Sequence, residues 1–405
     1  MKNIIKIWLF VFILLGNLFA QQYKPEANLT SLSKTVNKTN ITNINILAVM
    51  VEFQEDTDGA TFGDGKFGSI YKKDYGKSII DPLPHDKQYF ENHLLFAKNY
   101  YSKVSENKVS IDYTVLPNVI KVTKKMRDYS PLPKSSDFTL LGELSKEVWQ
   151  MVVAENPNLD FSQFNLFAVF HAGVGRDVNL PGSLGNERDL PSVYLSQGEF
   201  KKIFGADFTG FPANNALITN TIILPETESR EISGITGDVL LELSINGLIV
   251  SSIASHMGLP DLFDTNTGLS AIGRFGLMDG QAIFAYSGLF PPEPSAWEKI
   301  YLGWEIPHEI SNSGQYQIVL TTKLVSQLLD SRIIKIPINN SEYFLIENRQ
   351  RDAKKDGITL TIADNGSIIT KTFPKDTTGF NIAGVDSLQG VILDVDEFDW
   401  AVPGN

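Results

Sequence analysis

Three neighbouring stretches of sequence decide the fold of this chain. The first reads Asp238-Val-Leu-Leu-Glu-Leu-Ser-Ile-Asn-Gly-Leu-Ile-Val-Ser-Ser-Ile-Ala-Ser-His-Met-Gly-Leu-Pro-Asp261. The second reads Gly273-Arg-Phe-Gly-Leu-Met278, and the third reads Ser295-Ala-Trp-Glu-Lys-Ile-Tyr-Leu-Gly-Trp304.

The first stretch predicts a long helix. Asp238 is a suitable N-cap, and Gly258 followed by Pro260 supplies the end of the helix. Because apolar residues surround most of its circumference, we expect this helix to be buried.

The composition is that of a globular protein. The chain has 405 residues, of which 42% are hydrophobic and 20% charged, which is enough apolar content for a large core. The 35 Lys and Arg residues against 47 Asp and Glu residues give a net charge of -12, and the basic residues form no cluster. We therefore expect no nucleic-acid partner.

The chain has no cysteine. This excludes disulfides, thiolate metal sites and a cysteine nucleophile. A metal ion would need His, Asp or Glu ligands, and the sequence has five histidines, which are His85, His93, His171, His256 and His308.

The N-terminus has the pattern of a secretory signal peptide. Lys2 and Lys6 precede an apolar run from Ile7 to Leu15, and Ala20 offers a small residue for cleavage. We assign residues 1–20 to this signal and residues 21–43 to a flexible leader rich in Asn, Thr and Ser. No later stretch approaches the roughly 20 apolar residues of a membrane span. The sequence thus predicts a secreted protein, extracellular or periplasmic.

Helical and strand patterns alternate in the first half of the chain, which favours a layered α/β or α+β domain. We predict a helix beginning at Asp86, another over Thr139–Val153, and strands at Ile44–Phe53, Val109–Leu116 and Asn165–Phe170. Thr221–Pro225 reads as a short edge strand, because its proline cannot donate to a neighbour.

Short strand-like runs separated by turns fill the C-terminal hundred residues, so this region is predicted to be rich in β-structure. The runs are Tyr316–Leu320, Ile333–Pro337, Tyr343–Glu347, Ile358–Ile362 and Val391–Val395.

Together, the three opening stretches resemble the immune inhibitor A family of secreted zinc metallopeptidases, which are related to the metzincins. Family members carry His-Glu-x-x-His-x-x-Gly-x-x-Asp on a helix, a Gly-x-Trp-Asp-Leu-Met turn and a Ser-Ala-Trp-x-Lys-x-x-Leu-Gly-Trp segment. The resemblance covers roughly residues 44–405. It implies an α+β fold, with a zincin-like metallopeptidase domain over 44–304 and a β-rich region over 305–405.

Aligned without gaps on Gly258, this sequence departs from the family pattern at the chemical positions. Asp261 falls on the third zinc-ligand position and Met278 on the methionine of the turn below the metal. The two histidine positions hold Ser251 and Ser255, and the glutamate position of the general base holds Ser252.

Serine cannot replace these residues chemically. A neutral hydroxyl is a poor zinc ligand, and loss of a general base typically costs about 10²–10⁴-fold in rate. His256 lies about 100° around the helix from the second ligand position and has no histidine four residues before it. The structural alternative is that the serines fill the site and bond to helix carbonyls one turn back, while His256 interacts with the end of the helix.

Two groups of oxygen-bearing side chains could bind calcium. Asp261, Asp264 and Asn266 crowd one turn, without EF-hand spacing. The second group is an acidic run consisting of Asp394, Asp396, Glu397 and Asp399. Solvated carboxylates are the alternative for both groups. His171 either lines the cleft or bonds to backbone at the end of its strand.

The leading hypothesis is a secreted pseudopeptidase that binds a peptide or protein partner and holds no zinc. The competing hypothesis is an active zinc endopeptidase with non-standard ligands, drawn from Asp261, His256 and His171, and with Glu231 or Glu242 as the base. A serine nucleophile at Ser252 paired with His256 lacks an elbow motif. A structural module of a longer secreted protein is the remaining possibility.

Overall fold

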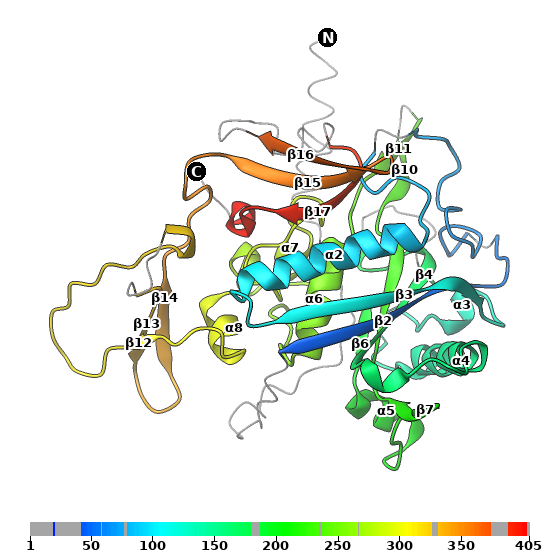
Figure 1. The fold of residues 1–405 in the computed structure, drawn as a ribbon, viewed down its shortest axis with the longest axis horizontal. Coiled ribbons are helices and arrows are strands. Elements are labelled where there is room, and N and C mark those ends of the chain that lie inside the picture. The colour runs from blue at the N-terminus through cyan, green and yellow to red at the C-terminus, as the bar shows by residue number, and fades with distance from the viewer. Residues whose placement is uncertain are drawn as a thin grey trace, which may run out of the picture.

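Four parallel strands and one antiparallel strand form the central sheet of the computed structural model (Figure 1). In spatial order they are β3 (Ser110–Lys121), β2 (Asn43–Glu52), β4 (Leu166–Val174), β9 (Thr221–Thr227) and the antiparallel edge strand β6 (Val193–Leu195). The structure describes residues 19–20, 42–57, 59–76, 79–133, 135–179, 187–234, 237–265, 267–325, 331–373 and 388–402.

The two faces of this sheet have separate cores, because successive side chains of a strand point to opposite faces. On β2, Ile46 and Ala48 join a core with α2 (Lys87–Val104) and α6 (Asn246–His256). Leu47 and Val49 join a second core with α4 (Thr139–Glu155). The helices predicted from Asp86 and over Thr139–Val153 are thus confirmed, as are the strands now assigned to β2, β3 and β4.

The predicted start of the central helix is wrong. Asp238 lies in β11 (Gly237–Leu241), which pairs antiparallel with β10 (Arg230–Gly234), and its carboxylate is 3.0 Å from Lys73 Nζ. Helix α6 begins only at Asn246, after the hairpin has ended at Leu241. Its predicted end is confirmed, since Gly258 follows with a φ of 96°. Its predicted burial is also confirmed.

The prediction of an edge strand over Thr221–Pro225 is also wrong. Strand β9 is buried along its whole length between β4 and β6. β6 covers only Thr221 to Ile223, whereas Pro225 pairs with His171 of β4. The proline is tolerated because it lies beyond the end of β6, where the strand has a neighbour on one side only.

Most of the C-terminal strand predictions are confirmed, in β13 (Ile333–Pro337), β14 (Tyr343–Glu347), β15 (Ile358–Asp364) and β17 (Val391–Val395). The run Tyr316–Leu320 is not a strand, and Leu320 makes only an isolated bridge to Ser331. Its side chains face solvent, with Val319 78% exposed, so no sheet packs against it. Strand β16 (Ser367–Phe373) was not predicted, and β12 (His308–Glu309) extends the small sheet of β13 and β14.

Helix α2 lies between the central sheet and the sheet formed by β16, β15 and β17 (Figure 1). Side chains from both sides of the expected boundary at Trp304 join one core, which includes Phe96 of α2 and Phe398 at a ring distance of 5.9 Å. The sheet of β12, β13 and β14 projects to the left of Figure 1.

Short elements complete the fold. The helices are α3 (Met126–Tyr129), α5 (Gln197–Phe204), α7 (Gly280–Ile283) and α8 (Ala296–Tyr301), with 3-10 turns at Phe161–Gln163, Gly273–Phe275, Lys323–Val325 and Phe398–Ala401. The strand pairs are β1 (Phe19–Ala20) with β5 (Val178–Asn179), and β7 (Phe211–Ala213) with β8 (Ala216–Ile218). In the described ranges, no helix has the length and apolar character needed to cross a membrane.

The predicted mixture of helices and sheets is confirmed at the level of an α+β fold. The predicted signal peptide and leader lie almost entirely outside the described residues.

Candidate functional site

Helix α6 carries the three serines at the family's histidine and glutamate positions. Ser251 is 0% and Ser252 is 1% exposed, and Ser255 is half-buried. Ser251 Oγ donates to Leu248 O at 3.0 Å, and Ser255 Oγ donates to Ser251 O at 3.1 Å. These two hydroxyls therefore bond to the helix's own carbonyls, as expected from the sequence. Ser252 Oγ is buried and makes no hydrogen bond within the described part of the chain.

His256 ends α6 and contacts the edge strand of the sheet. The hydroxyl of Tyr194, in β6, lies 3.1 Å from His256 Nδ1, and the two rings meet edge to face at 5.6 Å. Burial lowers the pKa of His256 to about 4, so its imidazole is neutral near pH 7. A neutral imidazole can accept the Tyr194 proton at Nδ1 while Nε2 carries the hydrogen. Tyr194 lies in a stretch rich in Gly and Pro, and no sequence signal pointed to it.

The segment after α6 is fixed to the predicted methionine turn. Leu262, the residue after Asp261, donates its backbone N–H to Met278 O at 2.8 Å. Met278 is fully buried in the same core as α6. Gly258, with its positive φ, lets the chain turn from the helix toward the half-buried Asp261.

Glu298 holds this turn from the other side. Its carboxylate accepts the backbone N–H groups of Leu277 at 3.0 Å and Met278 at 2.9 Å, and it also forms a capping box with Ser295 at the start of α8. Burial raises the pKa of Glu298. One buried carboxyl group of the Ser295–Trp304 stretch thus holds the Gly273–Met278 stretch in place.

The donor set at this position does not fit a catalytic zinc ion, which normally takes three protein ligands. In the described ranges, no group of three or more His, Asp or Glu residues is placed to hold a metal. Of the candidate calcium ligands, Asp264 already accepts a hydrogen bond within its own turn, from Thr267 N to Asp264 Oδ1 at 3.1 Å. Asn266 lies outside the described residues.

The residues proposed to rescue zinc chemistry are engaged elsewhere. His171 is fully buried in β4, and its Nδ1 lies 2.9 Å from Ala172 O, which agrees with the backbone-bonded alternative. Glu231 Oε1 accepts the N–H groups of Lys72 and Lys73. Glu242 Oε1 accepts Ile80 N at 2.7 Å.

The acidic run near the C-terminus is solvated only in part, since Asp396 is exposed whereas the other three residues are paired or buried. Asp394 pairs with Lys103 at 2.7 Å, and Asp399 pairs with Arg349. Glu397 is buried and accepts Ala353 N at 3.2 Å, and burial raises its pKa to about 7. These partners come from α2 and from the segment that follows β14.

A buried polar network that sequence reasoning missed lies beside the N-terminal half of α2. His85 Nδ1 is 2.8 Å from Glu226 Oε1, and His85 Nε2 is 2.9 Å from Asp81 O. When Glu226 is ionised, both partners are acceptors, so both ring nitrogens carry hydrogens and His85 is an imidazolium. Burial lowers the pKa of His85, but the hydrogen bonds and charges of Glu226 and Asp81 together outweigh burial, so the pKa is raised.

The network extends to the start of α6. Asn246 Nδ2 donates to Leu289 O at 3.0 Å, which orients the amide so that its Oδ1 accepts from His93 Nδ1 at 2.6 Å. His93 Nε2 then faces Asp81 Oδ2 at 3.6 Å. Burial lowers the pKa of His93 and raises that of Asp81, so it favours the neutral form of each side chain. All of these side chains are fully or almost fully buried, which indicates that they hold the fold together.

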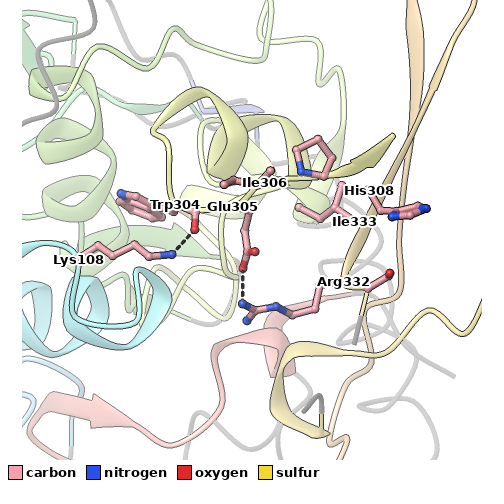
Figure 2. Close-up of a pocket in the computed structure, with 9 residues that line it drawn as sticks. Lys108, Trp304, Glu305, Ile306, His308, Arg332 and Ile333 are labelled. Atoms are coloured by element: carbon pink, nitrogen blue, oxygen red, sulfur yellow. Dashed lines mark hydrogen bonds and ion pairs between the residues drawn. The ribbon is translucent and has the colours of Figure 1, made fainter. Parts of the chain in front are cut away.

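Two of the hollows on the described surface lie away from α6, which lines neither of them. One, of about 470 Å³, lies beside Trp304 and Arg332 (Figure 2). There Arg332 is 3.2 Å from Glu305, and Lys108 donates to the Trp304 carbonyl (Figure 2). The other, of about 670 Å³, lies at the ends of β2 and β3.

No protein-family model matches this chain, and a search of curated proteins finds no significant match. The likeness to the immune inhibitor A family therefore rests on the residues quoted above.

Proposed function

We propose that this protein is an exported zincin-like pseudopeptidase, similar to the immune inhibitor A family, that binds a peptide or protein partner without cleaving it. The observation that carries the proposal is the state of α6. The two histidine positions hold serines that bond to the helix itself, and the base position holds a buried serine. All three hydroxyls are poor zinc ligands, and none of them can take a proton from water near neutral pH.

The arrangement around α6 supports a zincin-like scaffold. A mostly parallel sheet ends in the antiparallel strand β6, whose Tyr194 contacts the end of α6, and a buried methionine turn is tied to the segment after the helix. Among the described strands, none pairs with the outer side of β6. That side offers backbone groups to an extended peptide, which could add to the sheet as a further strand.

Metal analysis of the purified full chain, combined with a peptidase assay on casein with and without chelator, tests the missing chemistry. We expect no stoichiometric zinc and no cleavage that depends on metal. Stoichiometric zinc together with chelator-sensitive cleavage would support the active endopeptidase instead.

The binding half of the proposal has its own test. Met257 caps α6 and Met278 lies in the turn beside it, so labelled methionine methyl groups report on this region by NMR. A pool of extended nonapeptides rich in Val and Thr should shift the Met257 and Met278 signals. If neither methyl signal shifts when the pool is added, peptide binding along β6 is contradicted.

Restoring the motif provides a third test. The triple variant Ser251→His, Ser252→Glu and Ser255→His should gain zinc without unfolding if the space around α6 is preserved. Unfolding of the variant would mean that the space has collapsed, which would make binding at this face doubtful.

A further inference from the structure

The hollow at the ends of β2 and β3 has features of a binding site. It lies outside the carboxyl ends of two parallel strands, where ligands commonly bind in open α/β sheets. The first turns of α2 and the loops around Phe67 and Leu83 close its other sides, and its volume is about 670 Å³. Its lining includes no residue of α6 or β6, so it is separate from the face discussed above.

The walls of this hollow are largely apolar. Met50 is buried at its base and Phe67 is half-buried. Leu83 and Val119 are 41% and 42% exposed at its rim. Exposed apolar side chains in the lining of a hollow favour the entry of an apolar group.

The charges of the lining do not cancel. The imidazolium of His85 is matched by Glu226 behind it, and Lys87 is paired with Glu91. Glu52 accepts only the backbone N–H of Phe67 at 3.2 Å, and no cation pairs with it within the described ranges. Asp86 likewise accepts only Tyr89 N, as the N-cap of α2. An acidic excess therefore remains beside the apolar walls.

We infer that this hollow binds a peptide segment in which an apolar side chain stands next to a lysine or arginine. The apolar side chain would pack against Met50, Leu83 and Val119, and the cation would pair with Glu52. Charge complementarity favours this occupant over an acidic peptide, because Glu52 and Asp86 would repel a carboxylate. The inference does not depend on the proposed function, since the two sites share no residue.

The methionines make the two sites distinguishable in one NMR experiment. The sequence has six methionines, and Met50 lies in this hollow, whereas Met257 and Met278 lie beside α6. Met151, which packs in the core on the other face of the sheet, is a remote control. The probes are three hexapeptides of glycine and serine with leucine-lysine, leucine-glutamate or serine-lysine at the centre.

We expect the leucine-lysine peptide to shift the Met50 signal at millimolar concentration, and the other two peptides to bind at least about threefold more weakly. Unchanged Met50 signals with the leucine-lysine peptide would overturn the inference. An equal response to the leucine-glutamate peptide would also overturn it, because the acidic lining would then play no part.

Two variants test the contacts. Glu52→Gln should weaken binding of the leucine-lysine peptide by about threefold to fivefold, the range of a partly exposed ion pair. Glu309→Gln, which removes an exposed carboxylate in β12, should leave it unchanged. Val119→Arg, at the exposed rim, should abolish binding while the Met151 signal stays in place. Retained binding in both site variants would refute the assignment.

Discussion

Tyr194 and His256 join the edge strand of the central sheet to the end of α6, with the tyrosine hydroxyl 3.1 Å from His256 Nδ1. The two residues are 62 positions apart in the chain. Because burial keeps His256 neutral, Nδ1 can accept a hydrogen bond from this hydroxyl. The contact therefore fixes the position of β6 relative to the serine-bearing helix.

Tyr194→Phe removes that contact and should destabilise the protein by about 1–2 kcal/mol, because a buried nitrogen loses its donor. Urea denaturation followed by circular dichroism measures the change. Tyr316→Phe is the matched control, since Tyr316 is 51% exposed and donates only to Asn312 O. If the two variants lose equal stability, the contact between β6 and α6 has no special role.

Ser252 and Ser251 offer a matched pair of substitutions within one helix. Both are buried, but Ser251 Oγ donates to Leu248 O, whereas Ser252 Oγ makes no hydrogen bond in the described part of the chain. Ser→Ala gives the same gain in helix propensity at both positions. Ser252→Ala should therefore be more stable than Ser251→Ala by about 1 kcal/mol in urea denaturation. Equal stabilities would indicate that Ser252 has a partner in solution, such as water.

The sequence predicted the end of α6 but not its start, for a physical reason. Gly258 ends the helix by its own backbone conformation, which is a local property. Ile245 at the start has no side-chain cap, and Asn246 is held by His93 and Leu289 from distant elements. Asp238 carried the local signal of an N-cap, and the β10–β11 hairpin overrode it.

The candidate site was predictable only in part for the same reason. Ser251, Ser252 and Ser255 could be placed because they share one helix, whose period is regular. Tyr194 could not be placed, because a strand of three residues carries little periodicity. The His85–Glu226 pair spans 141 positions, and no local pattern encodes such a contact.

The missing side chain of Gly247 lets α6 pack closely against Ile283, and this gives a third prediction. A Cβ atom at Gly247 would lie 1.8 Å from Ile283 O, which is backbone and cannot move aside easily. Gly247→Ala should therefore destabilise the protein by about 3 kcal/mol, despite its better helix propensity. Gly59→Ala is the control, because open space surrounds a Cβ there. Thermal denaturation measures the stability of both variants. Equal midpoints for the two variants would contradict the close packing of α6.

The buried His85–Glu226 pair predicts how stability depends on pH. The pKa of His85 is raised in the folded state above its ordinary value of 6.5, because the hydrogen bonds and charges of Glu226 and Asp81 together outweigh the effect of burial. The pair's contribution is therefore complete below pH 6.5 and is lost as the pH rises through the raised pKa. The free energy of unfolding should therefore fall as the pH rises from 6.5 through the raised pKa of His85.

Glu226→Gln tests this expectation. The variant removes the charge that favours the imidazolium, so it should be about 3 kcal/mol less stable near pH 6 and should lose less further stability as the pH rises. Urea denaturation from pH 5.5 to 9 measures both effects. Glu309→Gln removes an exposed carboxylate 3.0 Å from Lys335 and should keep the wild-type slope. A Glu226→Gln slope equal to that of the wild type would show that His85 is not charged in the folded protein.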